Sequence, residues 1–133
     1  MTPNRLLVSA AGGGVLAYDV LEPEPCVASA TALCITGDRF RVESRWRDFA
    51  GHSGAGHAVP LSGDTGGFWF FDPDNLELFV KEIDGQDYNN AFWSFYGALS
   101  NVEFTVLATD TATGAQRGYF TPSRRFASQG DID

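Results

Sequence analysis

The chain has 133 residues, of which 44% are hydrophobic and 20% are charged, with a formal net charge of -8 and a pI of about 4.5. This length fits one domain, and the hydrophobic share excludes a chain that is disordered throughout. The acidic balance argues against polyanionic partners, so we expect no binding to nucleic acid or to anionic lipid. No apolar run reaches about 18 residues, so the sequence predicts no membrane insertion.

The chain divides into three expected parts. Residues 1–25 form a lead segment that ends in Glu22-Pro23-Glu24-Pro25, which we interpret as an extended linker. The apolar stretch near its start is short and broken by glycines, so we interpret it as an edge strand or a flexible lead and expect any natural export signal elsewhere. Residues 26–122 form the domain, and residues 123–133 form a tail that we expect to be frayed.

Cys26 and Cys34 are the only cysteines, and the seven residues between them suit a small loop closed by a disulfide. If it is oxidised, this loop predicts a secreted or cell-surface protein. A zinc site is disfavoured, because two cysteines do not fill a tetrahedral site and His52 and His57 follow at a spacing that matches no zinc finger.

A half-buried strand is expected between Arg39 and Asp48, where apolar or small residues alternate with charged ones. The four arginines of this segment fall on one face, which we interpret as solvated and salt-bridged: Arg39, Arg41, Arg45 and Arg47. The glycine-rich segment 49–58 that follows is interpreted as a flexible loop.

Two aromatic runs, 67–71 and 91–98, are interpreted as the paired central strands of the fold. Further strands are expected near 59–61, 76–83, 102–110 and 115–120, separated by turns rich in Asp, Asn and Gly. This spacing predicts an all-β fold: a single antiparallel β-sandwich, immunoglobulin- or fibronectin-like, with about seven to nine strands.

A series of short motifs spans residues 26–122: Cys26, Leu33-Cys34, Arg39-Phe40-Arg41-Val42, Trp46-Arg47-Asp48, Val59-Pro60-Leu61, Asp64-Thr65-Gly66, Phe68-Trp69-Phe70-Phe71-Asp72-Pro73, Asp84-Gly85, Phe92-Trp93, Phe95-Tyr96-Gly97, Val102-Glu103-Phe104, Thr109-Asp110-Thr111 and Thr113-Gly114. In this order the chain resembles an uncharacterised repeat-type domain of exported bacterial proteins. The resemblance implies a secreted, disulfide-containing β-sandwich, and it assigns no functional residue. Gly67 departs from the pattern, where a tyrosine is common, and this weakens an aromatic ligand platform at that end.

One candidate metal site consists of oxygen-bearing side chains in two turn clusters: Asp72, Asp74 and Asn75, with Asp84 and Asp87 expected near them across the sheet end. Oxygen ligands of this kind suit calcium, although the spacing is not that of an EF-hand. The alternative is that Asp-Pro-Asp-Asn is only a turn. No other cofactor is expected.

The candidate ligand-binding residues are aromatic: Trp69, Phe71, Trp93 and Tyr96. Alternation places Phe68 and Phe70 on one face of their strand and Trp69 and Phe71 on the other, so both faces are apolar. A sandwich needs only one apolar face for its core, so either loops cover the second face or it is a platform on which sugar rings stack.

Catalysis is not expected. Asp64-Thr65-Gly66 is similar to an aspartic protease motif over only three residues, and we interpret it as a turn with a positive φ at Gly66. The group Asp48, His52 and Ser53 lacks a nucleophile elbow.

The sequence therefore predicts a non-catalytic secreted module that binds a glycan or another extracellular protein through its turn ends or an aromatic face. Two alternatives remain: an inhibitor of an exoenzyme that uses the 49–58 loop, and a structural spacer.

Overall fold

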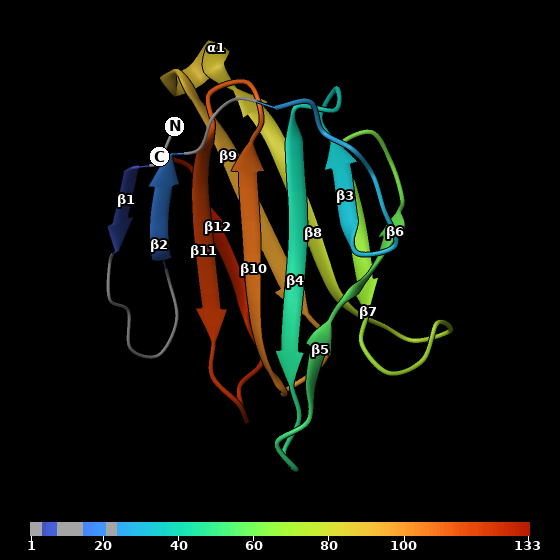
Figure 1. Cartoon of the computed structure of the whole chain (residues 1–133). Helices are drawn as coiled ribbons and strands as arrows, with labels where there is room; N and C mark the ends of the chain where they lie inside the picture. Colours follow the sequence, from blue (N-terminus) through green and yellow to red (C-terminus); the bar gives the residue numbers. More distant parts are fainter. Residues whose placement is uncertain (1–3, 8–14, 21–23) are drawn as a thin grey trace.

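The protein is a β-sandwich of two antiparallel sheets in a computed structural model that describes residues 4–7, 15–20 and 24–133, with side chains for the last range (Figure 1). Sheet A has the order β1 (Asn4–Leu7), β2 (Val15–Val20), β11 (Ala115–Thr121), β10 (Glu103–Asp110), β4 (Phe40–Arg47) and β3 (Ala32–Ile35), with β5 (Ser53–Ala55) also paired to β4. Sheet B has the order β12 (Ser128–Asp131), β9 (Ala91–Ala98), β8 (Leu76–Gly85), β7 (Thr65–Trp69) and β6 (His57–Pro60). The one-turn helix α1 (Gln86–Asn89) joins β8 to β9. The predicted β-sandwich is confirmed.

Strand β4 follows the predicted alternation. Phe40, Val42 and Ser44 are buried between the sheets, and the intervening side chains point outward. The outward row is partly salt-bridged, as expected, because the Arg41 guanidinium pairs with Glu43 at 3.1 Å. The alternation of apolar or small side chains with charged ones therefore decides which side of β4 enters the core.

The core lies between the two sheets and draws on both. Its buried members come from β3, β4, β7, β8, β9, β10, β11 and the turns beside them: Leu33, Ile35, Phe40, Val42, Phe68, Phe70, Leu78, Val80, Tyr96, Val102, Phe104, Val106, Ala108 and Tyr119. These side chains remove a continuous apolar layer from water, which is the main force that holds the sheets together.

The prediction that the two aromatic strands pair with each other is wrong. Strand β8 lies between β7 and β9 and is hydrogen-bonded to both, so the aromatic strands share a sheet without touching edges. The physical reason is the chain order. Each of these three strands pairs antiparallel with the next one, because short connections favour adjacent pairing.

The predicted loop 49–58 is also corrected. Ser53–Ala55 forms β5 on β4, and His57–Pro60 forms β6 on β7, so only the tip before β5 projects. Backbone hydrogen-bonding groups otherwise exposed at the two sheet edges are thereby paired, which favours ordered strands over a flexible loop.

The expected frayed tail is an ordered strand. Ser128–Asp131 pairs with β9 as β12, and the Ala98 N–H donates to the Ala127 carbonyl at 2.9 Å. At the other end of the chain, β1 and β2 extend sheet A beyond β11, in agreement with the edge-strand interpretation. The expected linker at 22–25 falls partly outside the described residues.

Cys26 and Cys34 form a disulfide, as predicted, that ties the segment before β3 to β3 itself. The cross-link closes a loop with a sequence separation of 8 residues. Loop-closure entropy for so short a loop predicts that the double variant Cys26→Ser, Cys34→Ser loses about 2–3 kcal/mol of unfolding free energy. Urea unfolding of the oxidised protein and of the double variant measures this loss, and equal midpoints would contradict it.

Candidate functional site

The outer face of sheet B carries the aromatic side chains that the core does not use. Along β8, Leu78 and Val80 point into the core, and Phe79 and Lys81 between them point away from it. Along β9, Tyr96 points inward and Phe95 outward. We call this surface the outer face, and its large side chains are His57, Trp69, Phe79, Lys81, Ile83, Trp93 and Phe95.

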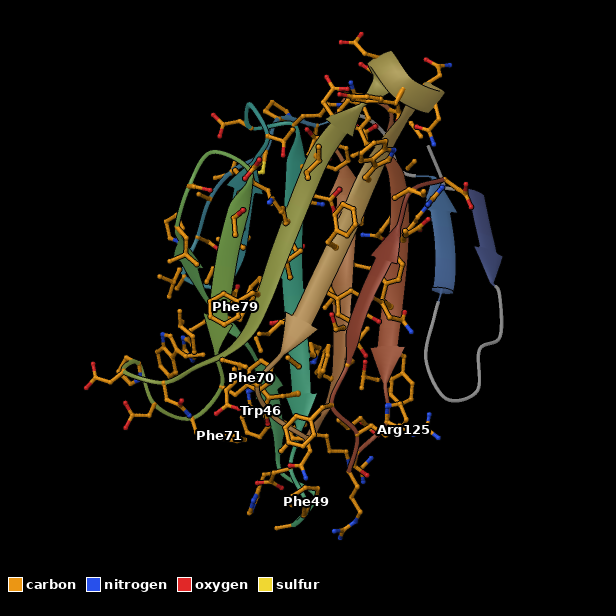
Figure 2. The ribbon with its side chains drawn as sticks, turned by 180° about the vertical axis from the view of Figure 1, so that it is seen from behind. Trp46, Phe49, Phe70, Phe71, Phe79 and Arg125 are labelled. Carbon is orange, nitrogen blue, oxygen red and sulfur yellow. A yellow bond between two sulfur atoms is a disulfide. The ribbon has the colours of Figure 1, made fainter. Side chains whose placement is uncertain are left out.

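A groove lies on the outer face over Gly97, beside the aromatic residue Phe79. Phe79 is paired with Gly67 on β7 and with Gly97 on β9. A Cβ atom at Gly97 would meet no atom within 4 Å, so the space above this residue is open. The groove has a volume of about 420 Å³, and it is lined by Thr65, Phe79, Val80, Lys81, Phe95, Tyr96, Gly97, Ser128, Gln129 and Gly130. Figure 2, which has sheet B in front, shows Phe79 on this sheet.

Two aromatic rings of the outer face pack against glycine residues. A Cβ atom at Gly130 would come within 2.7 Å of the Phe95 ring, and one at Gly85 would collide with the Trp93 ring. Each ring is thus supported on one face by a neighbouring strand. Phe95 and Trp93 are both half-buried, so part of each side chain remains accessible on the outer face.

The Trp93 end of the outer face has its own polar and aromatic partners. The Trp93 indole N–H donates to Asn89 Oδ1 at 2.8 Å, which holds the ring against α1. The Tyr88 ring lies 5.5 Å from the Trp93 ring, and Tyr88 is 82% exposed. A second, smaller aromatic surface therefore adjoins the helical turn.

The four predicted ligand-binding residues do not form one site. Trp69 stacks on His57 with ring centroids 3.7 Å apart, and it is paired with Leu76 of β8. Trp93 is paired with Ile83, seven positions further along β8. At about 3.3 Å per residue, roughly 23 Å of strand separates the two tryptophans.

The other two of these residues lie off the outer face. Phe71 follows β7 at one end of the sandwich, where it is 49% exposed and packs edge-on against Trp46 (Figure 2). Tyr96 borders the groove, but its side chain is only 6% exposed and lies in the core. Its hydroxyl donates to Gln129 Oε1 at 3.0 Å. Odd and even positions of β9 face opposite sides, so Tyr96 cannot share a platform with Trp93.

The predicted calcium ligands are not brought together. The turn before β8 contains Asp72, Asp74 and Asn75. Asp84 lies near the far end of β8, about 30 Å away at the usual rise per residue. Asp72 Oδ1 accepts a hydrogen bond from the Asp74 N–H at 2.8 Å, and Asn75 Nδ2 donates to Glu77 at 2.6 Å. These contacts are those of a turn. Within the described residues, no three His, Cys, Asp or Glu side chains are grouped so that they could hold a metal ion.

The turn motif Asp64-Thr65-Gly66 starts β7. Asp64 Oδ1 accepts hydrogen bonds from the hydroxyls of Thr65 at 2.8 Å and Ser62 at 3.3 Å. The expected positive φ at Gly66 is wrong. Glycine is required there for space, because the Leu33 side chain fills the position that a Cβ would take.

A polar cavity of about 190 Å³ lies between the sheets near α1. Glu82 of β8 points into it with 1% of its surface exposed, and the Ser94 hydroxyl lies 2.8 Å from one of its carboxyl oxygens. Burial raises the pKa of Glu82 to about 7, the Ser94 hydrogen bond opposes this shift, and nearby Asp131 adds to it. The cavity therefore contains a carboxyl group that changes charge near neutral pH.

Ion pairs surround this cavity. Arg39 donates to both carboxylate oxygens of Asp110 at 2.8 Å. Arg117 pairs with Asp131 at 2.6 Å, and the Tyr119 hydroxyl donates to the same carboxylate at 2.6 Å. The contacts of Asp131 with Arg117 and Tyr119 bridge the two sheets, whereas Arg39, adjacent to β4, and Asp110 of β10 both lie on the sheet A side.

The most informative residues of the groove were missed by the sequence interpretation. The sequence could have placed Phe79, Lys81 and Ile83 on one face, because they lie at alternate positions of a predicted strand. Gly130 was not detectable, because the tail was expected to be frayed. The groove exists only when β12 is placed beside β9.

The chain shows no significant similarity to any family model, any curated protein or any solved structure compared with it. In the described part of the chain, no helix has the length and apolar character needed to cross a membrane.

Proposed function

We propose that this protein is a non-catalytic carbohydrate-binding module whose ligand lies in the groove on the outer face. The observation that carries the proposal is the open space over Gly97, between the Phe79 side chain and the supported ring of Phe95. The C–H faces of sugar rings stack on aromatic rings of this kind, and the hydroxyls of Thr65 and Ser128 at the rim offer hydrogen-bonding groups.

The size of the groove supports a small ligand or a short stretch of a longer chain. Its volume of about 420 Å³ falls in the range of roughly 300–1,000 Å³ that is typical of small-molecule sites. Its surroundings are mainly apolar with few polar groups, as in such sites. An extracellular protein partner is less well supported, because a standard protein interface needs a patch of roughly 800 Å² per partner.

The disulfide supports a location outside the cytoplasm, either secreted or at the cell surface. Glycans are abundant ligands in that compartment. The acidic character of the whole chain agrees with a partner that is not a polyanion.

The test is to fill the groove without disturbing the fold. Gly97→Ile places a β-branched side chain in open space within a strand, so we expect unchanged or slightly higher stability, by up to about 1 kcal/mol. We expect binding on a glycan array to fall at least tenfold, because the new side chain occupies the ligand volume.

The matched control is Gly63→Ile in the turn before β7, where a Cβ would also meet no atom within 4 Å. This variant should bind as the wild type does. Wild-type binding that survives Gly97→Ile would contradict the groove. Absence of any glycan binding would overturn the proposed function in favour of the inhibitor or the spacer.

A further inference from the structure

The groove contains the only lysine of the chain. Lys81 lies on β8, directly between Thr65 of β7 and Phe95 of β9 in the register of sheet B. It is exposed and points to the outer face, on the same side as Phe79. A cation therefore stands beside the aromatic surface on which a ligand would stack.

No salt bridge in the described residues, 24–133, explains the position of Lys81. Its charge makes only a minor contribution to the lowered pKa of Asp64, which the hydroxyls of Thr65 and Ser62 mainly hold down. Lysines on edge strands prevent aggregation, but β8 is the central strand of sheet B. The position of Lys81 needs another explanation.

We infer that the groove selects an acidic saccharide, whose single carboxylate pairs with the Lys81 ammonium while its ring stacks on Phe95. This inference rests on the proposed function. Cross-strand partners such as Lys81 and Phe95 have Cβ atoms about 5 Å apart, so one sugar unit spans both contacts. Apolar neighbours on the outer face strengthen the charge interaction relative to open water.

The charge of the rest of the molecule limits how acidic this ligand is. The net charge of -8 repels a polymer that carries several charges on every unit. A mainly neutral saccharide with a single carboxylate is repelled only weakly by this net charge, and its carboxylate can still pair with Lys81. The expected class is therefore a uronate-containing oligosaccharide of low charge density.

The experiment uses a panel of uronate-containing oligosaccharides, each printed beside its carboxyl-reduced neutral counterpart. We expect the wild type to bind the acidic member of a pair about tenfold more tightly, and the preference to weaken as salt is raised. Lys81→Gln should abolish the preference and leave binding of the neutral member unchanged. Lys81→Arg should keep the preference, because it restores the positive charge.

A second measurement locates the contact. Reductive methylation with labelled formaldehyde keeps the charge of Lys81 and gives one lysine signal, because the chain has no other lysine. This signal should shift on titration with the acidic oligosaccharide that binds best, and shift less with its neutral counterpart.

Two outcomes distinguish the inference from the proposed function. Binding without preference for the acidic members, or a preference that survives Lys81→Gln, overturns the inference and leaves the carbohydrate-binding groove in place. Absence of binding to every member of the panel overturns the inference, and absence of binding on the whole glycan array, or binding that survives Gly97→Ile, overturns both.

Discussion

Replacing Phe68 by alanine is expected to lower the free energy of unfolding by about 4 kcal/mol. Phe68 lies on β7 of sheet B with 0% of its surface exposed, and it belongs to the core that joins the sheets. Truncation removes apolar surface from this core and leaves a cavity that the stiff strands on either side fill only in part. Urea unfolding followed by tryptophan fluorescence measures the loss.

The matched control is Phe79→Ala. Phe79 has the same side chain on the neighbouring strand, but it points to the outer face. We expect a loss of only about 1 kcal/mol for this variant, because its ring packs on one side only. It should also lose glycan binding. A cost for Phe68→Ala as small as that for Phe79→Ala would mean that the assignment of inner and outer faces is wrong.

Stability is expected to fall as the pH rises from about 4.5 to about 7, because of Glu82. Its pKa is raised from an ordinary value of 4.5 to about 7 in the folded protein, mainly by burial. Between these values the folded state keeps a proton that the unfolded state has released, so each increase in pH favours unfolding. The whole pKa shift of Glu82 corresponds to about 3 kcal/mol of unfolding free energy. This contribution is fully lost only above pH 7.

The variant Glu82→Gln tests this expectation. A neutral amide of the same shape has no charge to desolvate and can still bond the Ser94 hydroxyl. We expect the variant to be up to about 3 kcal/mol more stable than the wild type at pH 8, and nearly equal to it at pH 4. The control Glu103→Gln, outside the cavity between the sheets, should preserve the slope. A wild type whose stability does not fall between pH 4.5 and 7 would contradict the burial of Glu82.

The ion pairs around the cavity act in a separate pH window. Burial tends to raise the pKa of Asp110 and of Asp131, but hydrogen bonds from Arg39 and Tyr119 outweigh it and hold both values below the usual range. Their contribution to stability is therefore present above the ordinary carboxyl pKa near 4 and is lost as the pH falls below it. A loss of stability below about pH 4 therefore measures the contribution of these ion pairs. A loss of stability as the pH rises above 4.5 measures the effect of Glu82.

The sequence pattern correctly predicted those structural features that depend only on residues close together in the chain. Alternation predicted β4 and the opposite orientations of Phe68 and Trp69, because successive side chains of any strand face opposite sides. The short separation of Cys26 and Cys34 was enough for their cross-link. The number and order of the strands led to a β-sandwich before any pairing was known.

The sequence pattern did not predict those features that depend on which strands become neighbours in the folded protein. The Asp72 and Asp84 clusters lie at opposite ends of β8, because the two connections of an antiparallel strand leave from opposite ends. Tyr96 is buried because sheet A covers that side of β9, and alternation alone does not say which side is covered.

The amino-acid sequence by itself determined that this chain forms extended, alternating strands with a disulfide-closed loop, since these features depend on side chains a few positions apart. Only the tertiary structure decided that β8 separates the aromatic strands, that β12 completes the groove beside Gly97, and that Glu82 enters a polar cavity between the sheets. Strand partners are chosen by the free energy of burying the whole apolar layer, which is a property of both sheets together.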